Sequence, residues 1–312
     1  MMFDIDYLLA LQRLREATDD ALSPFLMGVS DFIIGNFTIL MMVFIYLCIN
    51  KRWGYFMLTN LFGAGIFNNF LKNTFCVYRP WIRDAAVMPY GNSKLTATGY
   101  SFPSGHTQSA TSIYGSIALI LKKHKWVVAL CVVIIVLVGF SRNYLGVHTP
   151  QDVIIGLLEG LLMLWVSDRL FKWIDKNPEK DVYILIIGVA ASILFMVYTI
   201  FKPYPIDYDE FGSIIVDPEK MKIDSFFYGG AVFGIVTGWF VERRFIKFST
   251  DVKWWRKILR FLIAVLLIVF VFNKLLKPEL MIFFGKQWGN LISAMILMWI
   301  TIILMPLIAK KI

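Results

Sequence analysis

Long runs of apolar residues, repeated along the whole chain, constrain its fold more than any other feature. A helix that crosses a membrane needs roughly 20 consecutive, mostly apolar residues, and many windows of this sequence meet that length. Hydrophobic residues make up 58% of the 312 residues and charged residues only 17%, which is more apolar than a soluble domain requires. The sequence therefore predicts an all-α fold, a polytopic bundle of transmembrane helices, and excludes a large soluble helical protein.

Hydropathy marks about nine spans. They cover residues 25–49, 54–71, 104–121, 126–141, 151–167, 182–201, 225–241, 258–273 and 288–308. Residues 1–23 precede them as an amphipathic segment, which lies in the membrane interface or forms a solvated terminal helix. We expect residues 24–170 to form a transmembrane core and residues 171–312 to add C-terminal transmembrane helices. Four glycines in the seventh span suit close helix packing: Gly229, Gly230, Gly234 and Gly238.

Basic residues distinguish the two faces of the predicted bundle. The net charge is +9, and if the spans alternate in direction, 18 of the 31 Lys and Arg residues fall on the face that holds the C-terminus. Lys and Arg concentrate in the cytoplasmic loops of membrane proteins. We therefore expect a cytoplasmic C-terminus, and we interpret the basic balance as a sign of orientation and not of nucleic-acid binding. The opposite face, with segments 72–103 and 142–150, is then extracytoplasmic.

Three short polar segments lie at the extracytoplasmic ends of the second to fifth spans. They read KNTFCVYRP from Lys72, PSGH from Pro103 and SRNYLGVHTPQD from Ser141. The spans were counted without reference to these segments. Because all three segments fall on the same face, we expect them to converge on one site.

The basic residues of these segments indicate an anionic ligand. Lys72 and Arg79 have no acidic neighbour within their segment, and Arg142 follows the fourth span. Arg offers paired donors to phosphate and Lys a compact charge; the alternative for Lys72 and Arg79 is snorkelling to lipid headgroups. Ser104 and Gly105 open the third span, where free backbone N–H groups can bind an anion. The alternative for Ser104 is a helix N-cap without a ligand.

Two of the three histidines fall in these segments, whereas His124 lies in a basic loop and is interpreted as a surface residue. His106, in the first turn of its span, is placed to donate a proton. Asp152 can cap the fifth span together with Thr149, or it can bond His148 and fix its tautomer; the two roles are compatible. No cluster of Asp, Glu and His suggests a metal cage, so we expect neither a metal nor a cofactor.

Together the segments resemble the type 2 phosphatidic-acid phosphatase superfamily, which also includes the vanadium haloperoxidases. The pattern K-x6-RP, PSGH and SR-x5-H-x3-D is matched in full, and the resemblance covers about residues 54–170, five helices with their loops. It implies that this part of the core is catalytic and metal-independent. It implies phosphate binding by Lys72, Arg79, Ser104, Gly105 and Arg142. It also implies that His148 attacks phosphorus to form a phosphohistidine, that Asp152 orients His148 and that His106 protonates the leaving oxygen.

The layout around these motifs leaves the substrate open. Two predicted spans precede the first motif, as in the glucose-6-phosphatase and sphingosine-phosphate phosphatase branches, whereas many bacterial lipid phosphatases have three. We expect an integral membrane phosphatase for a lipid phosphate or polyprenyl pyrophosphate, with membrane lipids as its other partners. A phosphatase for a soluble sugar phosphate is the alternative. A non-catalytic lipid-binding or transport protein has no need of the histidine pair. The acidic segment 202–224 is a lid or an ordinary solvated loop.

Overall fold

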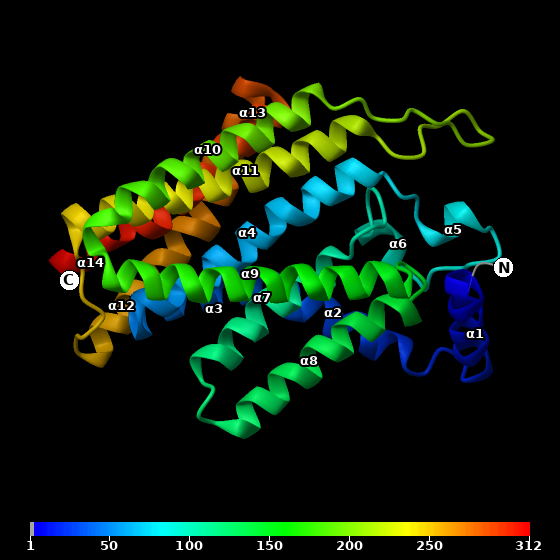
Figure 1. Cartoon of the computed structure of the whole chain (residues 1–312), viewed down its shortest axis with the longest axis horizontal. Coiled ribbons are helices and arrows are strands. Elements are labelled where there is room, and N and C mark those ends of the chain that lie inside the picture. The colour runs from blue at the N-terminus through cyan, green and yellow to red at the C-terminus, as the bar shows by residue number, and fades with distance from the viewer. Residues whose placement is uncertain (1–2) are drawn as a thin grey trace. The chain divides into compact units, whose positions relative to one another are not determined.

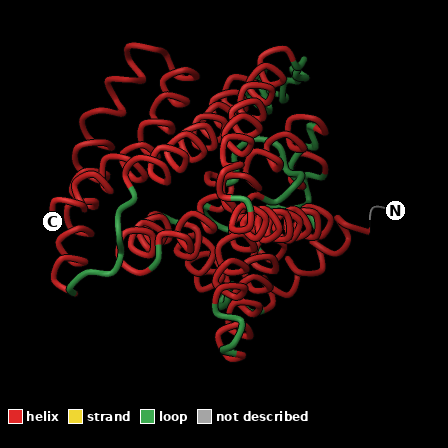
Figure 2. Tube along the Cα trace, turned by 60° about the vertical axis from the view of Figure 1, so that its left-hand side comes forward, coloured by secondary structure: helices red, strands yellow, loops and turns green. Residues whose placement is uncertain are grey.

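The computed structural model describes residues 3–312 and is built of helices joined by loops (Figure 1). Within these residues no regular strand is formed, and one isolated antiparallel bridge pairs Tyr208 with Ile214 (Figure 2). The predicted all-α fold is thereby confirmed.

The helices follow one another along the whole described chain. They are α1 (Phe3–Ala17), α2 (Ser23–Ile34), α3 (Asn36–Phe44), α4 (Lys51–Phe75), α5 (Pro80–Arg83), α6 (Ser93–Thr96), α7 (Gly105–Ile120), α8 (Lys125–Tyr144), α9 (Pro150–Lys176), α10 (Asp181–Phe201), α11 (Pro218–Val241), α12 (Trp254–Val265), α13 (Lys277–Trp299) and α14 (Met305–Lys311). Short π-helical or 3₁₀ segments join or extend several of them: η1 (Ile45–Ile49), η2 (Pro178–Lys180), η3 (Glu242–Ile246), η4 (Leu266–Leu276) and η5 (Ile300–Leu304).

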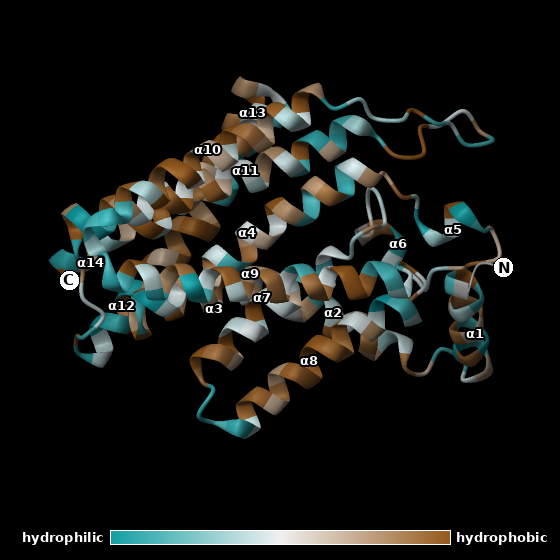
Figure 3. Ribbon diagram, in the orientation of Figure 1, coloured by the Kyte–Doolittle hydropathy of each residue, from teal (hydrophilic) through white to brown (hydrophobic). Residues whose placement is uncertain are grey.

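Among the described residues, five stretches are long and apolar enough to cross a membrane. They are Ser23–Ile49, Lys125–Tyr144, Pro178–Phe201, Pro218–Ile246 and Trp254–Lys311. The predicted count of nine spans is not confirmed. Three predicted spans lie on α4, α7 and α9, the helices that carry Lys72, His106 and Asp152. The last two predicted spans fall within the single stretch Trp254–Lys311. In Figure 3, α8 and α10, which belong to two of the five stretches, are predominantly hydrophobic along their length.

The chain divides into two compact units that interleave along the sequence. The first contains the described residues up to Thr38 together with Phe67–Leu164 and Pro203–Pro218. The second contains Ile39–Ile66, Trp165–Lys202 and Glu219–Ile312. All the motif residues belong to the first unit. The division into 1–23, 24–170 and 171–312 stays a prediction about the sequence.

Close packing within the first unit brings the ends of its helices together. A Cβ atom added to Gly156 of α9 would lie 2.5 Å from the backbone oxygen of Ser104, so glycine lets α9 touch the start of α7. The backbone N–H of Ser104 also donates to the carbonyl of Asp152 at 2.9 Å. The segment before α7 and the first turn of α9 are therefore joined directly.

The N-terminal helix α1 packs within the same unit. Its Ile5 and Leu8 are buried against Val87, and the Arg15 guanidinium donates to the carbonyl of Met88 at 2.6 Å. Leu14 stays 52% exposed. Part of the apolar side of the predicted amphipathic segment is thus covered by the protein itself.

The second unit is held together by glycine contacts and by a buried carboxylate. A Cβ atom added to Gly230 of α11 would lie 2.1 Å from the carbonyl oxygen of Leu291 on α13. This is the close packing that the glycines of α11 predict. Glu242 is buried and accepts from Lys51 at 2.9 Å and from the Tyr55 hydroxyl at 3.0 Å, so its charge is compensated.

Candidate active site

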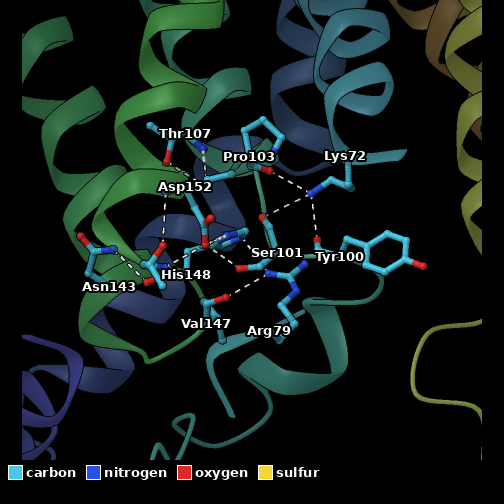
Figure 4. A network of polar contacts seen from close by, with 12 residues as sticks. Lys72, Arg79, Tyr100, Ser101, Pro103, Thr107, Asn143, Val147, His148 and Asp152 are labelled. Carbon is cyan, nitrogen blue, oxygen red and sulfur yellow. Dashed lines mark hydrogen bonds and ion pairs between the residues drawn. The ribbon is translucent and has the colours of Figure 1, made fainter. Parts of the chain in front are cut away.

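Four helix ends carry the motif residues. Lys72 lies in the last turn of α4, Ser104 is the N-cap of α7, Arg142 lies in the last turn of α8 and Asp152 in the first turn of α9. His106 interacts electrostatically with four other motif residues: Lys72, Arg79, Arg142 and His148. The structure therefore brings the three motifs to one place, and Figure 4 shows polar contacts of Lys72, Arg79, His148 and Asp152.

Asp152 makes both of the contacts that the sequence left open. Its Oδ2 accepts from the backbone N–H of Thr149 at 2.9 Å, and the Thr149 hydroxyl oxygen lies 3.4 Å from the Asp152 backbone nitrogen, as in a capping box. The same Oδ2 lies 3.3 Å from Nδ1 of His148 and accepts from the Ser101 hydroxyl at 2.5 Å (Figure 4). One carboxylate thus caps α9 and orients the imidazole.

The contacts of His148 favour one tautomer. Its Nδ1 faces the Asp152 carboxylate, which can only accept, and its Nε2 lies 2.9 Å from Nη1 of Arg79, which can only donate. The proton therefore belongs on Nδ1 and the lone pair on Nε2. Burial, with the nearby Arg79 charge, lowers the pKa of His148 from 6.5 to about 3, so the imidazole is neutral at neutral pH.

Arg79 is buried and binds the backbone around it. Its Nε donates to the carbonyl of Gly99, its Nη2 to Thr98 and its Nη1 to Val147, each at 3.0 Å. Burial lowers the pKa of Arg79 to about 9, which leaves the guanidinium charged at neutral pH. An anion that reaches Nε2 of His148 has to displace or share the Arg79 contact there.

Lys72 also binds carbonyl oxygens. Its ammonium donates to Pro103 at 2.8 Å, to Tyr100 at 3.0 Å and to Ser101 at 3.5 Å (Figure 4). Carbonyl groups satisfy the N–H donors without neutralising the charge. Lys72 therefore holds the segment before α7 in place while its positive field remains.

Arg142 differs from the other two cations. It is 1% exposed, and its Nη1 donates to the Ser30 hydroxyl at 2.7 Å. Its Nε and Nη2 are buried and have no hydrogen-bond partner among residues 3–312. Buried donors are normally satisfied, so this pair points to an acceptor that binds there.

Ser104 caps α7, as its alternative interpretation predicts. Its hydroxyl oxygen accepts from the N–H of Thr107 at 3.4 Å and from the Thr107 hydroxyl at 3.0 Å. The hydroxyl proton of Ser104 remains available to a ligand, whereas its backbone N–H is already bonded to Asp152. His106, half-buried, has no hydrogen bond to its ring in the described part of the chain.

Sequence reasoning missed several polar groups of this region. Ser101 binds Asp152, and Asn143 donates to the carbonyl of His148 at 2.9 Å. Glu159 is 3% exposed and accepts from Asn68 at 2.7 Å. Glu159 was detectable, because a carboxylate inside a predicted span is costly and usually functional.

The acidic segment after α10 also contacts the motif region. The hydroxyl of Tyr78, the residue before Arg79, donates to Asp207. Burial and this carboxylate raise the pKa of Tyr78 to about 12. The hairpin around the bridge between Tyr208 and Ile214 ends in Phe211, which is 84% exposed.

Within residues 3–312, no group of three or more His, Cys, Asp or Glu side chains could hold a metal ion. The charged groups that act on the His148 imidazole are Arg79, Asp152 and Lys72.

Comparison with known families agrees with the motifs. Residues 53–176 match the model of the PAP2 superfamily, and residues 226–312 match the model of the PAP2 superfamily phosphatase transmembrane extension. Every candidate site residue lies within the first match. The second match covers α12 to α14 and most of α11.

Curated relatives carry names of lipid phosphatases. The chain is 35% identical over 139 residues to phosphatidylglycerophosphatase B of Bacillus subtilis, covering 42% of this chain and 64% of the relative. It is 44% identical over 85 residues to an undecaprenyl-diphosphatase of Sulfolobus acidocaldarius, covering 27% of this chain and 39% of the relative. The chain thus spans less than two thirds of the length of each. No solved structure matches the chain.

Proposed function

We propose that this chain, which belongs to the PAP2 superfamily, is an integral membrane phosphatase that hydrolyses a lipid phosphate or polyprenyl pyrophosphate. The proposed reaction proceeds through a phosphohistidine and without a metal ion. The observation that carries the proposal is the arrangement around His148. Its Nδ1 faces Asp152, its Nε2 carries a lone pair, and two unpartnered donors of the buried Arg142 lie in the same cluster.

The first half of the reaction transfers the phosphoryl group to the protein. Nε2 of His148 attacks phosphorus, the P–O bond to the lipid breaks, and His106 gives a proton to the leaving oxygen. The Nδ1–H donates to Asp152, which stabilises the positive charge that forms on the imidazole. Lys72, Arg79 and Arg142 stabilise the charge on the phosphoryl oxygens.

The second half releases phosphate. Water attacks the phosphorus of the phosphohistidine, His106 accepts the water proton, and the P–N bond breaks to restore neutral His148. The same three cations hold the oxygens throughout. Because they supply positive charge where many phosphatases use divalent ions, the scheme has no step that needs a metal.

The substrate class follows from the surroundings and from the relatives. The motif helices belong to a chain with several stretches able to cross a membrane, so a lipid could approach laterally and present only its headgroup. The two relatives described above are named phosphatidylglycerophosphatase B and undecaprenyl-diphosphatase. We place the site on the extracytoplasmic face and the C-terminus in the cytoplasm, following the charge bias of the sequence.

The test is phosphate release by the purified protein from a matched panel. The panel contains phosphatidylglycerophosphate, phosphatidic acid, undecaprenyl diphosphate and glucose 6-phosphate, each with wild type and with His148→Ala. We expect hydrolysis of at least one lipid substrate, no turnover by His148→Ala, and an acid-labile, alkali-stable label on wild-type protein quenched with labelled substrate. Exclusive hydrolysis of glucose 6-phosphate would overturn the substrate class, and full labelling of His148→Ala would overturn the mechanism.

A further inference from the structure

The guanidinium of Arg142 is held from a helix that lies outside the matched catalytic region. Ser30 belongs to α2 and Arg142 to α8, and the Arg142 Nη1 donates to the Ser30 hydroxyl at 2.7 Å. Both residues are buried, with 0% of Ser30 and 1% of Arg142 exposed. Ser30 precedes the family match at residues 53–176, and no motif includes it.

The atoms of Arg142 that remain unpartnered form a pattern. Nε and Nη2 lie on one edge of the planar guanidinium, the edge that binds two oxygens of a carboxylate or phosphate side by side. Both nitrogens are buried without a partner in the described structure, whereas Nη1, outside that edge, is bonded to Ser30. The bond to Ser30 therefore leaves the whole bidentate edge open.

The choice of a hydroxyl keeps the charge of Arg142 available. A carboxylate in the place of Ser30 would form an ion pair with the guanidinium and compete with an incoming anion. A serine hydroxyl accepts the N–H and carries no charge. Asp31, the next residue, acts on Arg142 electrostatically, but it is exposed and no hydrogen bond joins the two side chains in the described chain.

Arg142 also links this contact to the nucleophile. Its backbone carbonyl accepts from the N–H groups of Val147 and His148, at 3.1 and 3.2 Å. The residue whose guanidinium is fixed by α2 thus fixes the backbone of His148. The position of the open guanidinium edge relative to the imidazole therefore depends on two sets of contacts, those of the Arg142 guanidinium and those of its backbone carbonyl.

We propose that Ser30 is a positioning residue of the phosphate site, which holds Arg142 so that its Nε and Nη2 bind two oxygens of the phosphoryl group. The proposal rests on the proposed function of the site. It assigns α2 a part in phosphate recognition, and it makes Arg142 the bidentate ligand among the three cations.

The experiment compares vanadate inhibition and phosphate release in wild type, Ser30→Ala, Ser30→Cys and Ser23→Ala. Ser23 is a matched control, because it is also a buried serine of α2 but its hydroxyl donates to Asp20 at 3.1 Å. For Ser30→Ala we expect about tenfold weaker vanadate inhibition and about tenfold lower kcat/KM, or about 1.4 kcal/mol. Ser30→Cys keeps a weaker acceptor, so its kcat/KM and its vanadate inhibition should fall less. Both quantities should stay within about twofold of wild type in Ser23→Ala.

A second pair of variants separates positioning from general stability. In the Arg142→Lys background no guanidinium is present, so adding Ser30→Ala should change the residual kcat/KM by less than about twofold. If Ser30→Ala lowered kcat/KM equally in both backgrounds, the role of Ser30 would be merely structural. The same conclusion would follow if kcat/KM fell in parallel with the thermal unfolding temperature in Ser30→Cys and Ser23→Ala. Wild-type affinity in Ser30→Ala would overturn the inference alone. If wild type itself released no phosphate and ignored vanadate, the proposed function would fail, and the inference with it.

Discussion

Replacing Asp152 by Asn tests the arrangement of the nucleophile most directly. The Oδ2 atom of Asp152 accepts from Ser101 at 2.5 Å and from the Thr149 N–H at 2.9 Å, and it lies 3.3 Å from Nδ1 of His148. An amide keeps the shape but brings two N–H donors and no charge. It can donate to Nδ1 and thereby hold the opposite tautomer, with the proton on Nε2, the atom proposed to attack.

The size of the effect follows from the contacts that are lost. A hydrogen bond to a charged group contributes about 1.5–3 kcal/mol, and about 1.4 kcal/mol of barrier is tenfold in rate. Loss of the bond to His148 alone therefore predicts a fall in kcat of about 10- to 100-fold. The wrong tautomer adds to this; in the Ser-His-Asp triad the corresponding change costs about 10⁴-fold. We expect a loss between about 10²- and 10⁴-fold.

The assay is kcat for the best substrate of the panel, with the amount of trapped phosphohistidine measured in parallel. Thr149→Ala is the matched control, because it removes the hydroxyl half of the cap, 3.4 Å from the Asp152 nitrogen, and leaves the carboxylate in place. It should cost about 1 kcal/mol of stability and little activity. If Asp152→Asn kept kcat within about threefold of wild type, the orienting role would be refuted.

Three further outcomes follow from the site and the topology. Phosphate release should persist in EDTA, because Lys72, Arg79 and Arg142 supply the positive charge; complete loss that magnesium restores would contradict the metal-free scheme. Since burial lowers the pKa of His148 to about 3, the imidazole stays neutral as pH falls through the ordinary histidine range near about 6.5. After correction for substrate ionisation, kcat/KM should therefore show no acid limb near that pH, and such a limb would refute the neutral, buried nucleophile. Asn92 is exposed. A cysteine placed there, in a background without Cys48, Cys76 and Cys131, should react with an impermeant thiol reagent outside intact cells. Reaction only after permeabilisation would show that the protein has the opposite orientation.

Hydropathy predicted most of the long helices, and the motifs named the residues that the structure brings close together. The reason is physical: Lys72, Ser104, Arg142 and Asp152 each lie at or next to a helix end, and helix ends are where hydropathy changes. The capping box of Thr149 and Asp152 is local in sequence and could be foreseen from three residues of spacing.

Contacts between distant segments could not be predicted in the same way. The carbonyl partners of Lys72 and Arg79 are backbone atoms. Every residue has a backbone carbonyl, so the residue type does not predict which carbonyls these cations contact. Ser30 meets Arg142 across 112 positions of the chain, and a serine in an apolar helix is an ordinary residue. The count of nine spans is not confirmed. The helix α7, Gly105–Ile120, has only 16 residues, whereas a helix that crosses a membrane needs roughly 20, and α4 and α9 are not among the stretches that are both long and apolar enough.

The carbonyl contacts of the Lys72 ammonium have a consequence for how the protein responds to its ionic surroundings. The carbonyl oxygens of Tyr100, Ser101 and Pro103 accept from this ammonium. Here the cation is attached covalently to α4, so it neither dissociates nor exchanges with solutes. The charge at this position is consequently the same in dilute and in concentrated salt, and it stays in place whichever monovalent ions surround the membrane.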